Sequence, residues 1–592
     1  MKTKAFILAI LALVATACDD FLEPVSLSTF DRNYVFSNVD DARRGVNAIY
    51  VHFSHDGFRS RLSNNMTGNT DIEHSSGWTS SGARYQIWDL NAQENNGDLQ
   101  FVWEIGYQAI RDANIAIEGL RASGTLESED VAERATMNHL LGEAYTLRAY
   151  WYSMLIYFFG DVPFTTEAPK AGVDFNQPRE DRNVILTTLI NDLIDVEENM
   201  MWASEAPYGI EQVNREYTLG MIARLALQRG GWYLAPDMTM QRESDYLDYY
   251  QIARDYSKKL MDLNDRQLPE DYRQVFLNQS KFISPTNSEI LFEVPFAIGE
   301  GDVGWNIGIT VEGGDHPFGA GNNYMSVPAT YYYSFDKQDQ RRDVTVALYK
   351  INSEFQEELI TIDNLPQGKW SRHFLEQGPG ASTSKGTGIN WPMMRYADVL
   401  LMFAEAENEL NGPTREAQEA LRRVRQRAFD EAVWDTRVEQ YITNASASKE
   451  DFFNAIVDER AWEFGGEMIR KYELIRWNLY EQKAQETVEG LKQLADDAFN
   501  GTGDLPDYIY WKYDESGDLV ILNPDEKLLA APDETWQRSP WLISLKDEVL
   551  GYDEWITRDW ANYTAPVRYV FPLPTVAIAN SQGVLQNNGY GF

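Results

Sequence analysis

Three glutamates recur every four residues along one predicted helix. Glu459, Glu463 and Glu467 have this spacing. Glycoside hydrolysis needs two carboxylates on opposite sides of the scissile bond, and successive turns of one helix cannot supply that arrangement. The basic residues nearby are Arg460, Arg470 and Arg476. We therefore predict ion pairs that fix this helix to its neighbours, and we expect no catalytic residues and no enzyme.

Other patterns that could support catalysis or metal binding are incomplete. His52, His55 and Asp56 carry ligand-type side chains, but no HExxH and no other zinc-like spacing accompanies them. A serine nucleophile would stand in a GxSxG elbow, which is absent from the sequence. The segment "DESGDLVIL" has calcium-loop residue types without the full spaced set, so it is better interpreted as a hairpin turn. We expect neither a metal nor a cofactor.

Aromatic residues indicate binding chemistry more clearly. They make up 13% of the chain, with 17 Trp and 32 Tyr. The CH-rich face of a sugar ring can cover an exposed Trp or Tyr, while Asp, Asn, Gln and Arg bond the hydroxyls at its edge. Covering about 80 Å² of sugar on one ring contributes roughly 2 kcal/mol. Two rings alone give about millimolar affinity. We therefore expect each binding contact to be weak and capture to gain strength from several contacts at once.

Two polar stretches combine aromatic rings with residues that bond hydroxyls. The first, "NTDIEHSSGWTSSGARYQIW", supplies Asp71, Glu73, His74, Trp78 and Trp88. The second, a glycine-rich loop, supplies Trp305, Asn306, Asp315, His316, Asn323 and Tyr324. Our hypothesis is that Trp78 and Trp305 are stacking platforms and that Asp71 contacts hydroxyls. Trp103 and Trp151 lie on predicted helix faces, where we expect them to pack.

The elements that must position these loops are predicted to be mostly helical. In "RYADVLLMFAEAENELNG" the apolar residues recur at helical spacing, and Asn411-Gly412-Pro413 ends the helix. Thr414 can cap a second helix through "REAQEALRRVRQRA", which completes a helical hairpin. Similar stretches are 99–119, 131–159, 184–200, 214–230, 245–263 and a pair near 449–480. Leu141-Gly142-x-x-Tyr145 matches part of a tetratricopeptide helix, but no strict 34-residue period follows, so we predict irregular helical pairs.

Between the helical blocks the composition changes. Residues 264–394 and 500–570 are rich in Gly, Asn, Asp, Pro and aromatics, and runs such as "EILFEVPF" and "DLVILN" predict short strands. We therefore expect a helical scaffold at about 30–263 and 395–480 and a loop-rich ligand region at about 264–394 and 500–570. No linker is evident, so residues 18–592 are predicted to form one domain.

The amino terminus is typical of an exported protein. Lys2 and Lys4 precede an uncharged apolar run that ends in small residues, directly before Cys18. Residues 1–17 resemble a lipoprotein signal peptide, in which Cys18 becomes the acylated first residue of the mature chain. An ordinary cleaved signal with an incidental thiol is the alternative. Cys18 is the only cysteine, which excludes an intramolecular disulfide, and the net charge of −39 argues against nucleic acid as a partner.

Several segments in order resemble the SusD/RagB family. They are "RYADVLLMFAEAENELNG", "LRRVRQRA", "ERAWEFGGEMIRKYELIRWNL" and "RYVFPLPTVAIANSQGVLQNNGY". "CDDFLEP", "DARRGVNAIY" and "VWEIGYQAIRDANIAIEGL" are similar to the front end of the family. The resemblance implies a tetratricopeptide-like helical half and a loop-rich half that holds the ligand. Asp19 and Asp20 resemble the acidic residues that direct such lipoproteins to the outer face of the membrane.

The function implied by this resemblance is glycan capture at the cell surface. Such a protein would be lipid-anchored to the outer membrane of a Gram-negative bacterium, facing the exterior. It would deliver an oligosaccharide or polysaccharide to a TonB-dependent outer-membrane transporter. A peptide-binding subunit of the same kind of importer is one alternative, and a glycoside hydrolase is a less favoured one.

Overall fold

A computed structural model describes the chain over residues 32–60, 68–75, 82–88, 90–174, 176–297, 301, 307–313, 317–378, 389–546 and 569–592. The protein is mostly helical, as predicted, with short strands between the helical blocks. The signal peptide, Cys18, Trp78, Trp305, Asn306, Asp315 and His316 lie outside the described residues.

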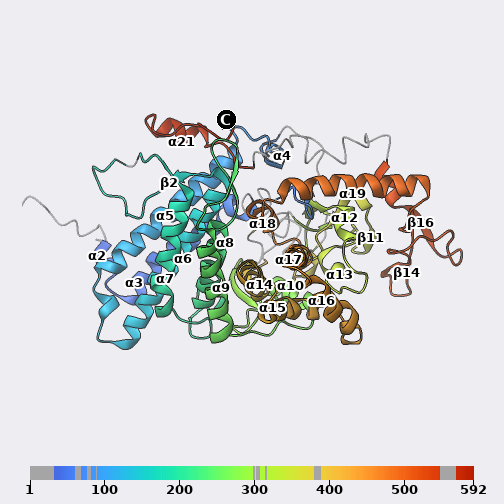
Figure 1. Ribbon diagram of the computed structural model, residues 1–592, viewed down its shortest axis with the longest axis horizontal. Helices are drawn as coiled ribbons and strands as arrows, with labels where there is room; N and C mark the ends of the chain where they lie inside the picture. The colour runs from blue at the N-terminus through green and yellow to red at the C-terminus, as the bar shows by residue number, and fades with distance from the viewer. Residues whose placement is uncertain are drawn as a thin grey trace, which may run out of the picture.

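The amino-terminal half consists of helices that pack on one another. They are α2 (Arg32–Val35), α3 (Val39–Tyr50), α4 (Ala83–Trp88), α5 (Gly97–Ala122), α6 (Val131–Phe159), α7 (Arg182–Val196), α8 (Arg215–Arg229) and α9 (Tyr246–Leu263). Figure 1 shows most of them in blue to green on one side of the molecule, with α4 nearer the middle of its upper edge. Residues 131–159 of α6 match the predicted bounds because Asp130 caps its start and Gly160, at φ +72°, ends it.

A second helical group occupies the centre of the molecule (Figure 1). It contains α14 (Tyr396–Asn411), α15 (Arg415–Arg427), α16 (Gln440–Ala445), α17 (Lys449–Phe464) and α18 (Arg470–Arg476). The predicted hairpin is confirmed, since the Thr414 side chain accepts from the Ala417 N–H and begins α15. α14 packs against both α9 and α15, so it joins the two helical groups. Their side chains form one continuous apolar core.

The loop-rich part carries several small sheets. Its helices are α10 (Tyr272–Ser280), α12 (Ala329–Tyr332) and α13 (Arg342–Thr345). Its strands are β6 (Ile290–Val294), β7 (Gly308–Val311), β8 (Gly321–Asn323), β9 (Met325–Val327), β10 (Tyr349–Ile351), β11 (Glu357–Leu359), β12 (Leu365–Pro366), β13 (Trp391–Arg395), β14 (Tyr508–Tyr513), β15 (Leu519–Ile521) and β16 (Gln537–Pro540). The orders are β11-β10-β7-β8, β13-β6 and β15-β14-β16, and β10 runs parallel to β7.

Short paired strands also join the amino-terminal helices. β2 (Val162–Pro163) pairs with β3 (Arg179–Glu180), and β4 (Tyr233–Leu234) pairs with β5 (Met240–Gln241). β1 (His74–Ser75) lies in a sheet with the order β1-β9-β12. These strands are too brief for hydrophobic periodicity to reveal them.

The long helix α19 (Tyr480–Asn500) lies beyond the predicted scaffold. Its buried residues recur at helical spacing: Tyr480, Ala484, Thr487, Leu491, Ala495 and Ala498. This helical pattern continues past residue 480, where we expected the scaffold to end. Figure 1 shows α19 lying along one edge of the loop-rich part, where Leu491 and Ala495 join a second apolar cluster.

Candidate ligand-binding site

The two polar aromatic stretches meet in the tertiary structure. β1 pairs antiparallel with β9, so that His74 lies opposite Ser326 and Ser75 lies opposite Met325. A Cβ added to Gly68 would lie 1.8 Å from Met325 Cε, so a larger residue there would force the buried Met325 side chain to move. The pairing therefore brings the segment that precedes α4 against the segment that carries Asn323 and Tyr324.

Half-buried rings and one guanidinium lie where these segments meet. The Arg84 guanidinium carbon is 4.5 Å from the centre of the Tyr324 ring and 5.9 Å from that of Trp88. The Tyr85 and Trp88 rings are in edge contact with centroids 5.3 Å apart. Arg84, Tyr85 and Tyr324 are half-buried, which leaves part of each side chain accessible to a ligand. We use "α4 surface" for these three residues.

Sequence reasoning missed Arg84 and Tyr85 although both lie inside the quoted stretch "SSGARYQIW". The signal was available, because a tyrosine and an arginine beside glycine and serine are residue types that suit sugar recognition. The structure adds the contact between Arg84 and Tyr324, which are far apart in the chain.

The position of Trp88 contradicts the prediction that its side chain contacts a ligand. Its side chain is 1% exposed and belongs to the main apolar core. The Asn69 side chain donates to the Trp88 carbonyl, which fixes this part of the loop from beneath. A ring this deeply buried offers no face to a sugar, so Trp88 supports the α4 surface instead of forming it.

Glu73, His74 and Asn323 are also buried. The Asn323 amide donates to Ser326 Oγ at 3.1 Å and to the Asn364 carbonyl at 3.3 Å. Glu73 Oε1 accepts from the Gly466 N–H at 3.1 Å. Their burial assigns these side chains to the framework of the loops and not to the ligand-contacting surface, which corrects the prediction for them.

Asp71 is engaged by a basic residue of the scaffold. Its two carboxylate oxygens accept from Arg470 Nε at 2.9 Å and Nη2 at 2.8 Å. Arg470 begins α18 and is buried, so this bidentate pair ties the ligand loop to the central helices. This pair gives Asp71 a positioning role, and its contact with ligand hydroxyls stays a prediction.

The pKa of Glu73 reflects this environment. Burial raises it, the Gly466 N–H lowers it and Asp71 raises it, with a net value of about 7. Lys369 and Arg470 lower it further. Its second carboxylate oxygen has no hydrogen-bond partner among the described residues. Protonation of Glu73 is therefore favoured under mildly acidic conditions.

A buried ion-pair network confirms the predicted ion pairing of the three glutamates, although α17 ends at Phe464 and Glu467 lies in the turn after it. Glu459 pairs with Arg341 at 2.6 Å and with Arg425 at 2.8 Å. Glu467 pairs with Lys369 at 2.7 Å and with Arg395 at 2.8 Å. These bonds connect α17 and the turn that follows it to β13, α15 and the loop-rich part.

Glu463 occupies the middle of the network. It pairs with Arg395 at 2.7 Å, with Arg341 at 3.1 Å and with Arg427. Burial alone would raise the pKa of Glu463, but the cations of Arg427, Arg395 and Arg341 lower it to about 2. All these side chains are inaccessible to substrate, so the network is structural.

Within the described residues, no group of His, Cys, Asp and Glu could hold a metal ion. His52 instead pairs with Asp112 at 2.8 Å. The segment "DESGD" forms the predicted turn between β14 and β15, in which Asp514 accepts from the Ser516 and Asp518 N–H groups. No described helix is long and apolar enough to cross a bilayer.

Comparison with known families gives two matches that together cover most of the chain. The family model described as "SusD family" matches residues 288–590. The model described as "Starch-binding associating with outer membrane" matches residues 36–227.

Two curated relatives come from Formosa agariphila. SusD-like protein P25 is 24% identical over 508 residues, covering 78% of this chain and 87% of the relative. SusD-like protein P2 is 23% identical over 499 residues, covering 81% and 91%.

Solved structures share the fold at low identity. A SusD homolog from Bacteroides thetaiotaomicron aligns with a TM-score of 0.74 and 19% identity, covering 94% of this chain and 98% of the other. Surface glycan-binding protein A of the same species, in complex with laminarihexaose, aligns with a TM-score of 0.59 and 15% identity, covering 93% and 99%.

Proposed function

Because the chain belongs to the SusD family, whose members are non-catalytic binding proteins, we propose that it captures a glycan at the cell surface and passes it to a TonB-dependent outer-membrane transporter. The observation that carries the glycan part is the meeting of the two loop stretches, which assembles Arg84, Tyr85 and Tyr324 into one accessible surface. A tyrosine ring beside a guanidinium suits the flat face and the hydroxyl edge of a sugar, and Tyr85 adds a second half-buried ring on the same short helix as Arg84.

The ligand loops are expected to complete this surface. Trp78 follows β1 in the chain, and Trp305 precedes β7. We retain both as proposed stacking platforms, with Asn306, Asp315 and His316 as proposed partners for hydroxyls. The pairing of β1 with β9 supports this proposal because β1 lies just before Trp78 in the sequence.

The place of action is proposed to be the exterior of the outer membrane. The family description of residues 36–227 associates such proteins with that membrane. Acylation of Cys18 would hold the chain there, because two or more acyl chains anchor a protein stably. The transporter partner rests on the family resemblance.

A glycan array probed with the lipid-free protein tests the ligand class, and a native affinity gel containing the selected polysaccharide confirms it. Retention by at least one neutral polysaccharide supports the proposal. Binding of oligopeptides without any polysaccharide would favour the peptide-binding alternative, and release of products from a glycan would favour a hydrolase.

A pull-down from outer membranes tests the partner. We expect the tagged protein to recover a TonB-dependent transporter, and its absence from repeated pull-downs with mild detergents would contradict the partnership. The array and the pull-down are independent, so the glycan and the transporter are accepted or rejected separately.

A further inference from the structure

A second groove lies away from the loop framework, on the amino-terminal helices. It has a volume of about 410 Å³ and is bounded by α5, by the chain between β2 and β3, and by α21 (Thr575–Asn580). This volume falls within the range of small-ligand sites. We propose that this groove binds a further stretch of neutral saccharide, an inference that rests on the proposed glycan-binding function.

The floor of the groove is aromatic and held in place. Trp103 and Tyr107 lie one helical turn apart on α5, with ring centroids 4.7 Å apart. Trp103 packs edge-on against Phe159 at 5.2 Å, and the Tyr107 hydroxyl donates to the Pro163 carbonyl at 2.8 Å. Both rings are half-buried, so part of each faces the groove. A sugar ring could therefore stack without reordering either side chain.

The rim of the groove is rich in side-chain amides. These are Gln100 and Gln108 on α5, Asn176 and Gln177 on the opposite segment, and Asn580 on α21. An amide both donates and accepts hydrogen bonds, as a sugar hydroxyl does. The charged residues that line the groove, Glu104 and Arg111, have opposite signs. An uncharged polyhydroxylated ligand matches this rim.

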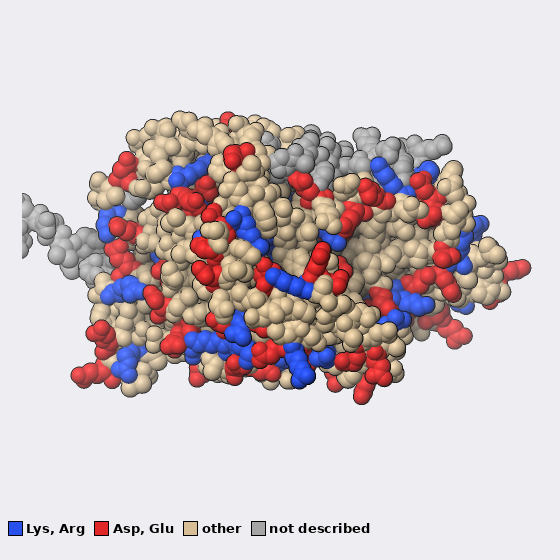
Figure 2. Space-filling view, viewed as in Figure 1, with Lys and Arg blue, Asp and Glu red and all other residues tan. Residues whose placement is uncertain are grey.

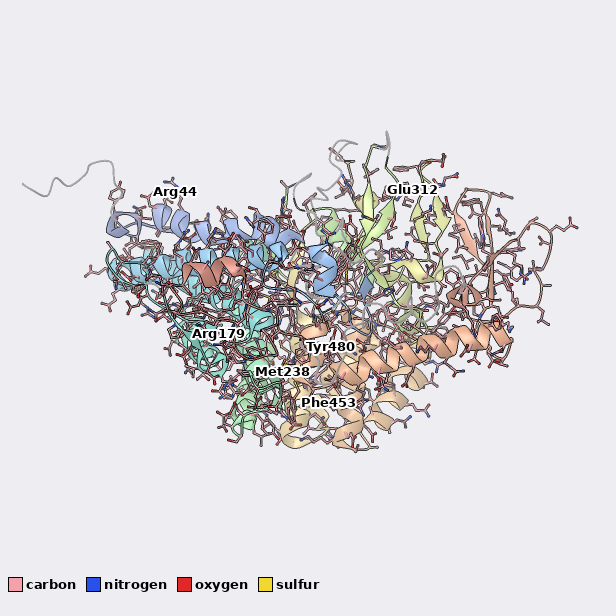
Figure 3. The ribbon with its side chains drawn as sticks, turned by 90° about the horizontal axis from the view of Figure 1, so that it is seen from above. Arg44, Arg179, Met238, Glu312, Phe453 and Tyr480 are labelled. Atoms are coloured by element: carbon pink, nitrogen blue, oxygen red, sulfur yellow. The ribbon has the colours of Figure 1, made fainter. Side chains whose placement is uncertain are left out.

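The wall formed by the carboxy-terminal segment favours the same ligand. Residues 569–592 contain no Asp, Glu, Lys or Arg, in a chain that is 24% charged. Figure 2 shows the upper left surface, where α21 lies in Figure 1, as largely uncharged. Arg179, labelled in Figure 3, donates to the Gln586 carbonyl at 3.0 Å, and Thr575 N–H donates to the Glu94 carbonyl at 2.8 Å. The wall is thus fixed at both ends.

The groove and the α4 surface are connected through the chain. The segment after α4 leads directly into α5, and the Asn96 amide donates back to the Ala83 carbonyl at 2.8 Å. In Figure 1, α21 and α4 lie along the same upper edge of the molecule. One long polysaccharide could occupy both sites, and two linked weak sites bind more strongly than either alone.

Photo-crosslinking tests the groove directly. The full mature protein is incubated with diazirine-tagged laminarihexaose, maltohexaose and mannohexaose, irradiated, and mapped by peptide mass spectrometry. We expect crosslinks in peptides from α5 and α21 as well as from the loop regions. Ala577→Trp fills the groove from its partly exposed wall and should lower the α5 and α21 crosslinks at least tenfold.

Ala579→Trp is the matched control. Ala579 is exposed on the same helix and does not line the groove, so this variant should crosslink like the wild type. Trp103→Ala removes the floor and should reproduce the loss seen with Ala577→Trp.

The outcomes separate the groove from the proposed function. Crosslinks confined to the loop regions, or α5 and α21 crosslinks that persist in Ala577→Trp, would overturn the proposal that the groove binds saccharide. Either result would leave the proposal of surface glycan capture intact. Failure of the wild type to crosslink any of the three hexaoses would overturn the groove as proposed, whereas glycan capture is decided separately by the array.

Discussion

Asp71 and Glu73 fix the strand that precedes the α4 surface. Asp71 makes a bidentate pair with Arg470, and Glu73 accepts from the Gly466 N–H. Gly466 has φ +79° and lies close to Gln367, so another residue there would be strained. The strand is therefore held by an ion pair to Arg470 and by a hydrogen bond from a glycine that no other residue replaces without strain.

Glu73→Gln is expected to raise stability at pH 8 and leave it nearly unchanged at pH 4. Burial first of all raises the pKa of Glu73 in the folded protein to about 7, so the folded state loses stability as pH rises from the unfolded pKa through 7. A neutral glutamine removes that loss, which amounts to about 3 kcal/mol. Thermal melting of both proteins across this pH range measures the difference, and an equal shift at both ends would contradict it.

Tyr324→Ala is expected to weaken binding of the array-selected glycan about tenfold. The ring lies 4.5 Å from the Arg84 guanidinium and is half-buried, so its loss removes a stacking face and loosens Arg84. Calorimetric titration measures the change. Tyr208→Ala is the control, because Tyr208 is 56% exposed and lies outside the α4 surface. An equal effect of the two substitutions would remove Tyr324 from the site.

At the scale of elements, α17 is joined by ion pairs to several neighbouring elements. Its glutamates reach Arg341 before α13, Arg395 in β13, and Arg425 and Arg427 in α15. Buried charges are costly to remove from water, so their value depends on complete pairing. We therefore expect the network to specify how these elements meet more than to add net stability.

Glu463→Gln is expected to destabilise the protein by about 3–5 kcal/mol, because it leaves Arg395, Arg427 and Arg341 with one buried negative charge fewer. Urea unfolding followed by circular dichroism measures the loss. Glu450→Gln on the exposed first turn of the same helix should cost under about 1 kcal/mol. Similar unfolding midpoints for the two variants would show that the network contributes little.

At the scale of the whole molecule, the acidic surface should not control ligand choice. The net charge is −39, yet the groove beside α5 carries balanced charges and the α4 surface contains one arginine and two tyrosines. Binding of a neutral glycan should change less than about twofold between low and high salt, since screening acts only on charged partners. Calorimetry at two salt concentrations checks this expectation, and a steep salt dependence would indicate a charged ligand.

Cys18→Ala tests the proposed anchor. Without the thiol no diacylglyceryl group can be attached, so the protein should shift from the membrane fraction to the soluble fraction of its host. Immunoblotting of the two fractions gives the measurement. A wild-type protein of unmodified mass that is already in the soluble fraction, like the variant, would support the ordinary cleaved signal.

Local patterns in the sequence were sufficient to predict the helical scaffold. α5, α6, α8, α9, α14 and α15 agree with the predicted stretches to within a few residues, because hydrophobic spacing and capping residues act over one or two helical turns. The ion pairing of Glu459, Glu463 and Glu467 could also be predicted, although not their partners. The buried residues of α19 also recur at helical spacing, so a local pattern indicates this helix too.

Contacts between distant segments were decided only by the tertiary structure. No local pattern pairs β1 with β9 or places Arg84 over Tyr324. The two tryptophans show the reason: Trp88 lies in a polar stretch yet is 1% exposed, whereas Trp103 lies on a helix face yet lines a groove. Periodicity reports which residues share a face of an element. Burial of that face depends on which remote segments pack against it, and that information is spread over the whole chain.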